Sequence, residues 1–221
     1  MKWLPMAWMV LACGLASGEE QRPAPDILRV LQRSQQQQLD AMTPADPTSP
    51  RAVKVRESFE KLVRVIAHPA LANAELRVVR GDVVGETLQG HIVVANSGLG
   101  DLPEGERIFV LAHELGHVVL GHWAQMSLVY AKWVPGPVEQ ERTDPIGDRL
   151  GHDASMLAYR QEFEADAFAL STLRALNLPD QFAMDAFMDL GWRSDTATHP
   201  GTRKRLAALR AGSLVQRHIS N

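Results

Sequence analysis

Two histidines and a glutamate at a fixed spacing form the clearest chemical motif of the sequence. His113, Glu114 and His117 give the pattern H-E-x-x-H within residues 108–120, an apolar stretch with helical spacing. Residues four apart share one face of a helix, so both imidazoles can bind the same cation while Glu114 projects beside them. These polar groups are costly to bury in an apolar helix unless a partner such as a metal ion is present. The pattern therefore predicts a metal centre at which Glu114 is free to take a proton from water.

A metal that is bound by two histidines needs at least one more protein ligand, and a later acidic segment offers it. Glu162 and Asp166 are four residues apart and share a helix face, whereas Glu164 points the other way. We assign Glu162 to the metal, and we assign Asp166 to a hydrogen bond that orients a histidine ligand. Histidine and carboxylate donors favour zinc, so we expect one Zn²⁺ per chain.

Other polar residues receive a structural interpretation. His122 is five residues beyond His117, which is about 140° around a continuous helix, so we expect it at the surface or at a helix cap. A basic cluster near the C-terminus is expected to be a solvated helix face; its members are Arg203, Lys204, Arg205 and Arg210.

The elements that must position these residues are predicted from hydrophobic spacing. Helices are expected over about residues 51–67, 106–123, 155–176 and 181–190, and strands over residues 76–80 and 91–95. One more helix is expected between the prolines of residues 19–50, with glutamines 35–38 on its solvated face. The sequence has no internal repeat and no sign of a second core, so it predicts a single, mostly helical α+β domain.

Charge and cysteine content exclude several classes of function. The net charge of −3 over 221 residues provides no large positive field, so we expect no nucleic-acid partner. The single cysteine, Cys13, rules out an intramolecular disulfide and a cysteine-based metal site.

The first eighteen residues have the order of an export signal. Lys2 precedes an apolar run over residues 3–12, and small residues follow as far as Gly18. The run is shorter than the roughly 20 apolar residues that span a bilayer. Three interpretations stay open: cleavage before Glu19, lipidation of Cys13 with peripheral membrane attachment, and an uncleaved anchor. In each case we expect the protein in the periplasm or cell envelope.

Taken together, the motifs resemble the HtpX and CaaX prenyl protease family of zinc metallopeptidases, metallopeptidase family forty-eight. The resemblance covers about residues 52–210. Its first part is a strand and a glycine-containing turn at residues 92–99, which lead into the H-E-x-x-H motif. The E-x-x-x-D motif of Glu162 and Asp166 follows, and a Thr-His-Pro turn at residues 198–200 precedes a basic helix.

The resemblance implies a role for each site residue. His113, His117 and Glu162 are implied to be zinc ligands, Glu114 the catalytic base and Asp166 a supporting residue. The same resemblance places His199 near the metal, where it stabilises the oxyanion or occupies the open position in a resting state.

The family also implies a zincin-like metallopeptidase domain, which we place at residues 51–221 after a signal at 1–18 and a Pro/Gln-rich helix and linker at 19–50. The membrane-embedded members have a long apolar segment after the helix that carries the H-E-x-x-H motif. Here the apolar run at residues 126–134 is short, and Lys132 interrupts it. We therefore expect a soluble, exported member. The segment between the two metal helices, which contains His152, is a candidate cover for the cleft.

The expected activity is zinc-dependent hydrolysis of peptide bonds in unfolded or misfolded proteins of the cell envelope. Zinc polarises the scissile carbonyl and activates water, while Glu114 takes the proton and passes it to the leaving amine. A strand at residues 76–80 or 91–95 is expected to align an extended substrate. The alternatives are an exported client-binding or assembly factor with a latent or non-proteolytic zinc site, and a purely structural metal site. The presence of Glu114 favours the enzyme over both alternatives, because zinc binding does not require this residue. The oligomeric state stays open.

Overall fold

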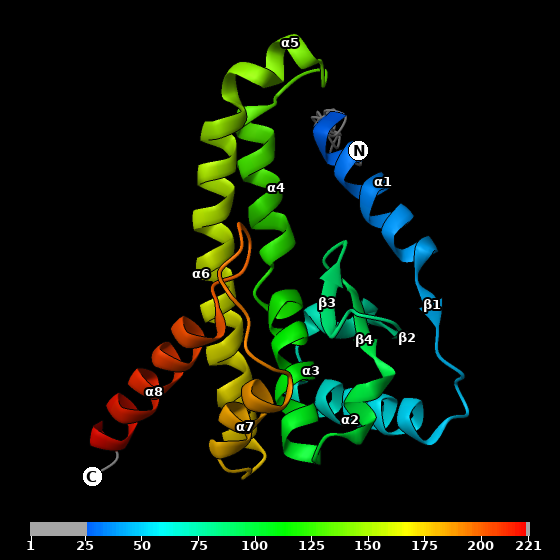
Figure 1. Cartoon of the computed structure of the whole chain (residues 1–221), viewed down its shortest axis with the longest axis vertical. Coiled ribbons are helices and arrows are strands. Elements are labelled where there is room, and N and C mark those ends of the chain that lie inside the picture. Colours follow the sequence, from blue (N-terminus) through cyan, green and yellow to red (C-terminus); the bar gives the residue numbers. More distant parts are fainter. Residues whose placement is uncertain (1–25, 220–221) are drawn as a thin grey trace, which may run out of the picture.

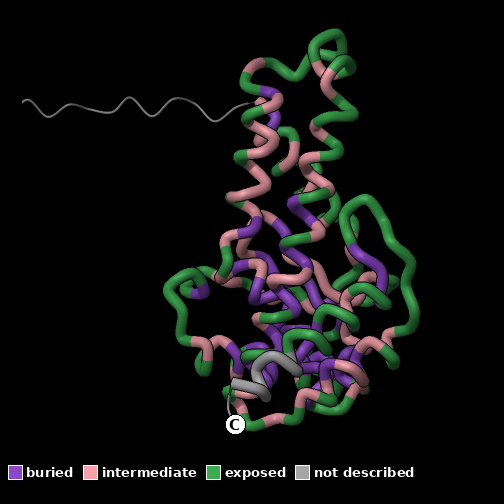
Figure 2. Tube along the Cα trace, turned by 90° about the vertical axis from the view of Figure 1, so that its left-hand side faces the viewer, coloured by how far each residue is buried: buried purple, intermediate pink, exposed green. Residues whose placement is uncertain are grey.

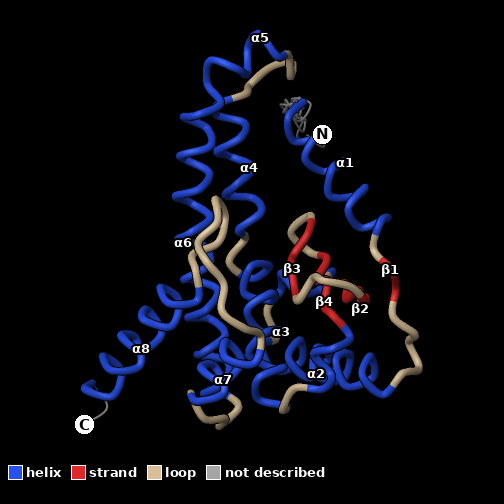
Figure 3. Tube along the Cα trace, in the orientation of Figure 1, coloured by secondary structure: helices blue, strands red, loops and turns tan. Residues whose placement is uncertain are grey.

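The computed structural model describes residues 26–219, most of which are helical (Figures 1 and 3). The helices are α1 (Asp26–Ala41), α2 (Pro50–Ile66), α3 (Glu104–Val119), α4 (His122–Trp133), α5 (Gln140–Thr143), α6 (Gly147–Ala175), α7 (Gln181–Asp189) and α8 (Thr202–Ile219). The strands are β1 (Thr43–Pro44), β2 (Glu75–Arg80), β3 (Gly85–Leu88) and β4 (Ile92–Asn96). Short 3₁₀ turns are η1 (Pro69–Asn73), η2 (Ser97–Asp101) and η3 (Asp144–Ile146). The predicted export signal at residues 1–18 lies outside the described residues.

Helix α3, which carries the H-E-x-x-H motif, lies at the centre of the core. Its residues Ile108, Leu111 and Leu115 are completely buried, and the helix contacts α2, α6, α7 and β3. Figure 2 shows the buried residues gathered in this part of the molecule. Burial on several sides explains why the helix is apolar nearly all round from Ile108 onward, apart from the residues of its motif.

A glycine lets the two helices of the predicted site approach each other closely. A Cβ atom at Gly116 of α3 would lie 3.1 Å from Cδ1 of Phe168 and 3.4 Å from Cα of Ala165, both in α6. Because glycine has no side chain, the two backbones meet at the turn that carries the motif.

The four-stranded sheet has the order β1-β2-β4-β3. Strands β2 and β4 are parallel, with Leu76 opposite Val93, and β3 is antiparallel to β4. The predicted strands at residues 76–80 and 91–95 are confirmed as β2 and β4, and the predicted fold class, a mostly helical α+β domain with a small sheet, is confirmed as well. The sequence missed β3, which is the edge strand beside α3 (Figure 1).

The helix that was predicted over residues 106–123 ends early. Gly121 has a left-handed φ of +66°, which interrupts the helical hydrogen bonds, and α4 starts anew at His122. Helix α4 then runs beside α6, and the two form a hairpin that projects from the rest of the molecule (Figure 1).

The segment between α3 and α6, the two helices that carry the predicted metal ligands, does not cover the predicted site. Helix α6 starts at Gly147, eight residues before the predicted helix, so His152 lies inside α6 in the outer part of the hairpin. Helix α5 forms the tip (Figure 1). The expectation of a covering loop is therefore wrong, because the turn-rich composition of residues 135–151 is used to reverse the chain between two helices. Among residues 26–219, none of the helices combines the length and the apolar composition that crossing a membrane requires.

Candidate metal centre

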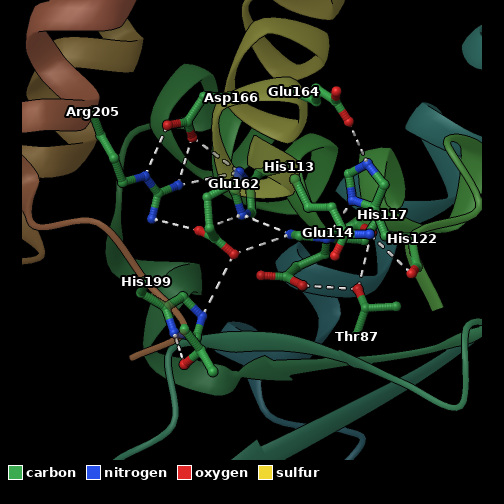
Figure 4. A network of polar contacts seen from close by, with 12 residues as sticks. Thr87, His113, Glu114, His117, His122, Glu162, Glu164, Asp166, His199 and Arg205 are labelled. Atoms are coloured by element: carbon green, nitrogen blue, oxygen red, sulfur yellow. Dashed lines mark hydrogen bonds and ion pairs between the residues drawn. The ribbon is translucent and has the colours of Figure 1, made fainter. Parts of the chain in front are cut away.

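The structure brings the three predicted metal ligands together from α3 and α6 (Figure 4). The Nε2 atoms of His113 and His117 are 3.2 Å apart. Glu162 Oε1 lies 3.5 Å from His117 Nε2, and Glu162 Oε2 lies 3.6 Å from His113 Nε2. All three ligand atoms lie within 4.8 Å of one another. Among the described residues, this is the one group of such side chains with metal-binding geometry.

The donor set fits a zinc ion. The Nε2 atoms of His113 and His117 face each other, and Glu162 Oε2 is a buried oxygen that accepts no hydrogen bond, although it has an ion-pair contact with Arg205. A cation among these atoms would satisfy all of them, and two histidines with one carboxylate are a known donor set of catalytic zinc.

On one side of the centre, Asp166 and Arg205 hold His113 and Glu162. Asp166 is 1% exposed, and its Oδ1 lies 3.0 Å from His113 Nδ1. Arg205, in α8, donates from Nε and Nη2 to the two oxygens of Asp166 at 2.8 and 2.5 Å. Its Nη1 lies 3.1 Å from Glu162 Oε2. Asp166 therefore lies where it was predicted, beside His113, one of the predicted ligands.

Neighbouring hydrogen-bond donors and positive charges keep both carboxylates ionised. Burial by itself would raise the pKa of Asp166, but the hydrogen bonds and charge of Arg205 outweigh it, and the pKa lies below its usual value. For Glu162, burial is likewise opposed, by a hydrogen bond from His117 and by the charges of His113 and Arg205, so its pKa is well below the usual range.

The prediction that Arg205 lies on a solvated face is wrong, because its side chain is only 16% exposed. Arg203, Lys204 and Arg210 are exposed, as predicted. Helical spacing offered a signal, since Arg205 falls on the face of α8 that also carries the buried residues Thr202 and Leu209.

On the other side of the centre, His122 contacts His117. The Nδ1 atoms of the two rings are 2.8 Å apart, and His122 Nε2 lies 3.3 Å from Glu164 Oε2. His122 is only 3% exposed, so the predicted surface position is wrong; the alternative, a helix cap, comes close, because His122 is the first residue of α4 after the N-cap Gly121. The angle of a continuous helix does not apply, because the break at Gly121 turns His122 back toward α3. Burial, followed by the nearby charges of His117 and His113, lowers the pKa of His122 to about 4, so this ring is neutral at pH 7.

Glu114 stands apart from the donor set. It is 6% exposed, and its Oε2 accepts a hydrogen bond from Thr87 Oγ1 in β3 at 2.8 Å. A Cβ atom at Gly85, also in β3, would lie 3.0 Å from Glu114 Oε1, so glycine leaves the space that the carboxylate fills. The sequence missed Gly85 and Thr87, because β3 is too short to show a clear alternation.

His199 lies at the same centre. Its Nε2 is 3.5 Å from Glu162 Oε1, and Thr198 Oγ1 lies 2.8 Å from its Nδ1. The side chain is 61% exposed, unlike the three predicted ligands. His199, Glu114 and the three predicted ligands line one cavity of about 470 Å³, whose other walls come from β3, α7 and the segment before α8.

Comparison with known proteins gives a family match over part of the chain. Residues 51–134 match the sequence model of peptidase family M48, which confirms the resemblance to metallopeptidase family forty-eight. The matched segment carries His113, Glu114 and His117, and the M48 family consists of zinc metallopeptidases. No curated protein matches the chain. The matched segment ends before Glu162, which the fold supplies from α6.

Proposed function

We propose that the protein is a zinc endopeptidase that cleaves unfolded or misfolded proteins of the cell envelope, with Glu114 as its general base. The observation that carries the proposal is the position of Glu114. Its carboxylate lies in the same cavity as the three predicted ligands but belongs to neither the donor set nor its supports. A structural zinc site has no use for such a group, whereas hydrolysis needs one.

A zinc ion held by His113, His117 and Glu162 would polarise the scissile carbonyl and acidify water. Glu114 takes the proton of the attacking water and later passes it to the leaving amine. The hydrogen bond from Thr87 keeps the Glu114 carboxylate turned into the cavity. His199 supplies an imidazole at the edge of the cavity that can donate a hydrogen bond to the developing oxyanion.

Strand β3 is the element best placed to align a substrate. Strand β4 lies between β2 and β3, so it has no free edge, and β2 does not line the cavity. The edge strand β3 contributes Gly85, Glu86 and Thr87 to the cavity wall. A peptide that adds to this edge must be extended, which favours unfolded segments over folded proteins. The proposed substrate-aligning strand is thus β3, in place of the two strands expected from the sequence.

The cell envelope as the place of action is supported by the signal-like order of residues 1–18. Lipidation of Cys13 and peripheral membrane attachment stay proposals of the same kind.

The test is cleavage of one disulfide-bonded protein offered in two forms, folded and, after reduction and alkylation, unfolded. The full chain is loaded with zinc and compared with Glu114→Gln at equal zinc content. We expect the unfolded form to be cleaved faster, and Glu114→Gln to lower the rate by about 10²–10⁴-fold. Zinc bound in both proteins with no cleavage by either would favour the client-binding factor and refute the proposed activity.

A second variant decides the role of His199. If the imidazole stabilises the oxyanion, His199→Ala lowers the rate of cleavage. If the imidazole occupies the open position in a resting state, the same change raises the rate.

A further inference from the structure

Each histidine ligand of a metal needs a partner for its second ring nitrogen. Such a partner fixes which nitrogen carries the proton and holds the ring in place. For His113 the partner is the carboxylate of Asp166, 3.0 Å from Nδ1. For His117 the nearest group is His122, which the proposed mechanism does not use.

We propose that His122 and Glu164 act as a pair that positions His117 for the metal. The proton positions follow from the geometry. A nitrogen that binds a metal must offer its lone pair, so His117 carries its proton on Nδ1. This N–H points to His122 Nδ1 at 2.8 Å, which must therefore accept the hydrogen bond. The proton of His122 is then on Nε2, which faces Glu164 Oε2 at 3.3 Å.

The contacts around His122 leave its ring few alternative orientations and hydrogen-bond partners. The residue is 3% exposed, and Gln161 Nε2 donates to its main-chain oxygen at 3.0 Å. Its Nε2 atom is buried and has no partner among the described residues other than Glu164. Without that carboxylate, a polar nitrogen would be left unpaired in the interior, which is costly.

Helix α6 thus contributes a carboxylate on each side of the His117 ring. Glu162 reaches its Nε2 from the cavity side, and Glu164, two residues further on, supports the back of the ring through His122 (Figure 4). Neither His122 nor Glu164 lines the cavity, so the pair does not touch substrate. Its role is to position a ligand, and its effect is therefore on metal binding.

The test measures zinc affinity by competition with a chelator, using the full chain and four variants. His122→Phe removes the acceptor, and we expect zinc affinity to fall about 10–100-fold. His122→Asn keeps an oxygen near the position of Nδ1 and should recover part of this loss. Glu164→Ala should weaken zinc binding as well. Arg160→Gln is the matched control, because it removes the 3.6 Å ion pair of Glu164 with Arg160 but keeps the side chains of both His122 and Glu164.

A spectrum and a melting curve separate positioning from folding. With Co²⁺ in place of zinc, His122→Phe should change the visible absorption of the metal, whereas Arg160→Gln should not. Thermal unfolding of the metal-free variants is measured alongside. If His122→Phe fails to fold, Glu164→Ala still gives the answer, because the side chain that it removes is 43% exposed.

Wild-type affinity and spectrum in His122→Phe and Glu164→Ala would overturn the proposal, as would equal losses in His122→Phe and His122→Asn. The proposal rests on the zinc site of the proposed function, yet the two fail separately. A wild-type protein that binds zinc but does not cleave leaves this proposal standing, and one that binds no zinc refutes both.

Discussion

Removing the charge of Arg205 should destabilise the metal-free protein strongly. Arg205→Met keeps an apolar chain of similar length over Phe187, whose ring centre is 4.8 Å from the guanidinium carbon, but it removes the positive charge. Two buried carboxylates would then face each other, since the side chains of Glu162 and Asp166 are only 6% and 2% exposed. The two hydrogen bonds from Arg205 to Asp166 would also be lost.

The expected loss follows from breaking a buried ion pair on one side. Such a change typically costs about 3–5 kcal/mol of unfolding free energy, because a buried charge loses its partner. For a chain of this length, each kcal/mol shifts the melting temperature by roughly 2–4 °C, so we expect Arg205→Met to melt about 6–20 °C lower. Zinc should reduce the difference, because its charge compensates Glu162.

The assay is thermal unfolding with a chelator present and again with zinc. Lys204→Met is the matched control. Lys204 is the residue before Arg205, but its side chain is 53% exposed and pairs with the exposed Asp195, and such surface pairs stabilise little. Arg205→Lys should lie between wild type and Arg205→Met, since lysine keeps the charge but cannot form both bonds to Asp166. If Arg205→Met melts like Lys204→Met in the presence of chelator, the ion pair does not hold the site together.

Two further predictions follow from the groups around α3. Gly85→Ala would place a Cβ atom 3.0 Å from Glu114 Oε1, so it should lower the rate of cleavage while zinc affinity, measured by chelator competition, stays unchanged. Burial and the charge of Asp189 raise the pKa of Glu106 to about 7, so between about pH 4.5 and 7 the folded protein binds a proton that the unfolded chain has lost. The stabilisation that comes from keeping Glu106 protonated in the folded protein is fully present below about pH 4.5 and is lost as the pH rises through about 7. Melting curves of Glu106→Gln should therefore show a larger gain over wild type at pH 8 than at pH 5; an equal gain at both pH values would contradict this reasoning.

The long helices could be predicted from the sequence because their buried apolar residues recur at helical intervals. Helix α2, for example, starts at Pro50 after Ser49, whose side chain accepts a hydrogen bond from the main chain of Ala52, and its buried residues keep helical spacing. The boundary at Gly121 was missed, since a single glycine after an apolar helix is compatible with both an end and a continuation. Strand β3 was missed because only four residues form it.

The amino-acid sequence by itself was enough to predict the metal donors and the base. The spacing of His113, Glu114 and His117 fixes their mutual geometry as soon as a helix forms, and the same holds for Glu162 and Asp166. Only the tertiary structure decided which groups support them. Arg205 meets His113 from 92 residues away, and Thr87 meets Glu114 from 27 residues away. His122 contacts His117 only because the chain turns at Gly121. Local spacing carries no information on such encounters, since they depend on how α3, α6, α8 and β3 pack around the same core.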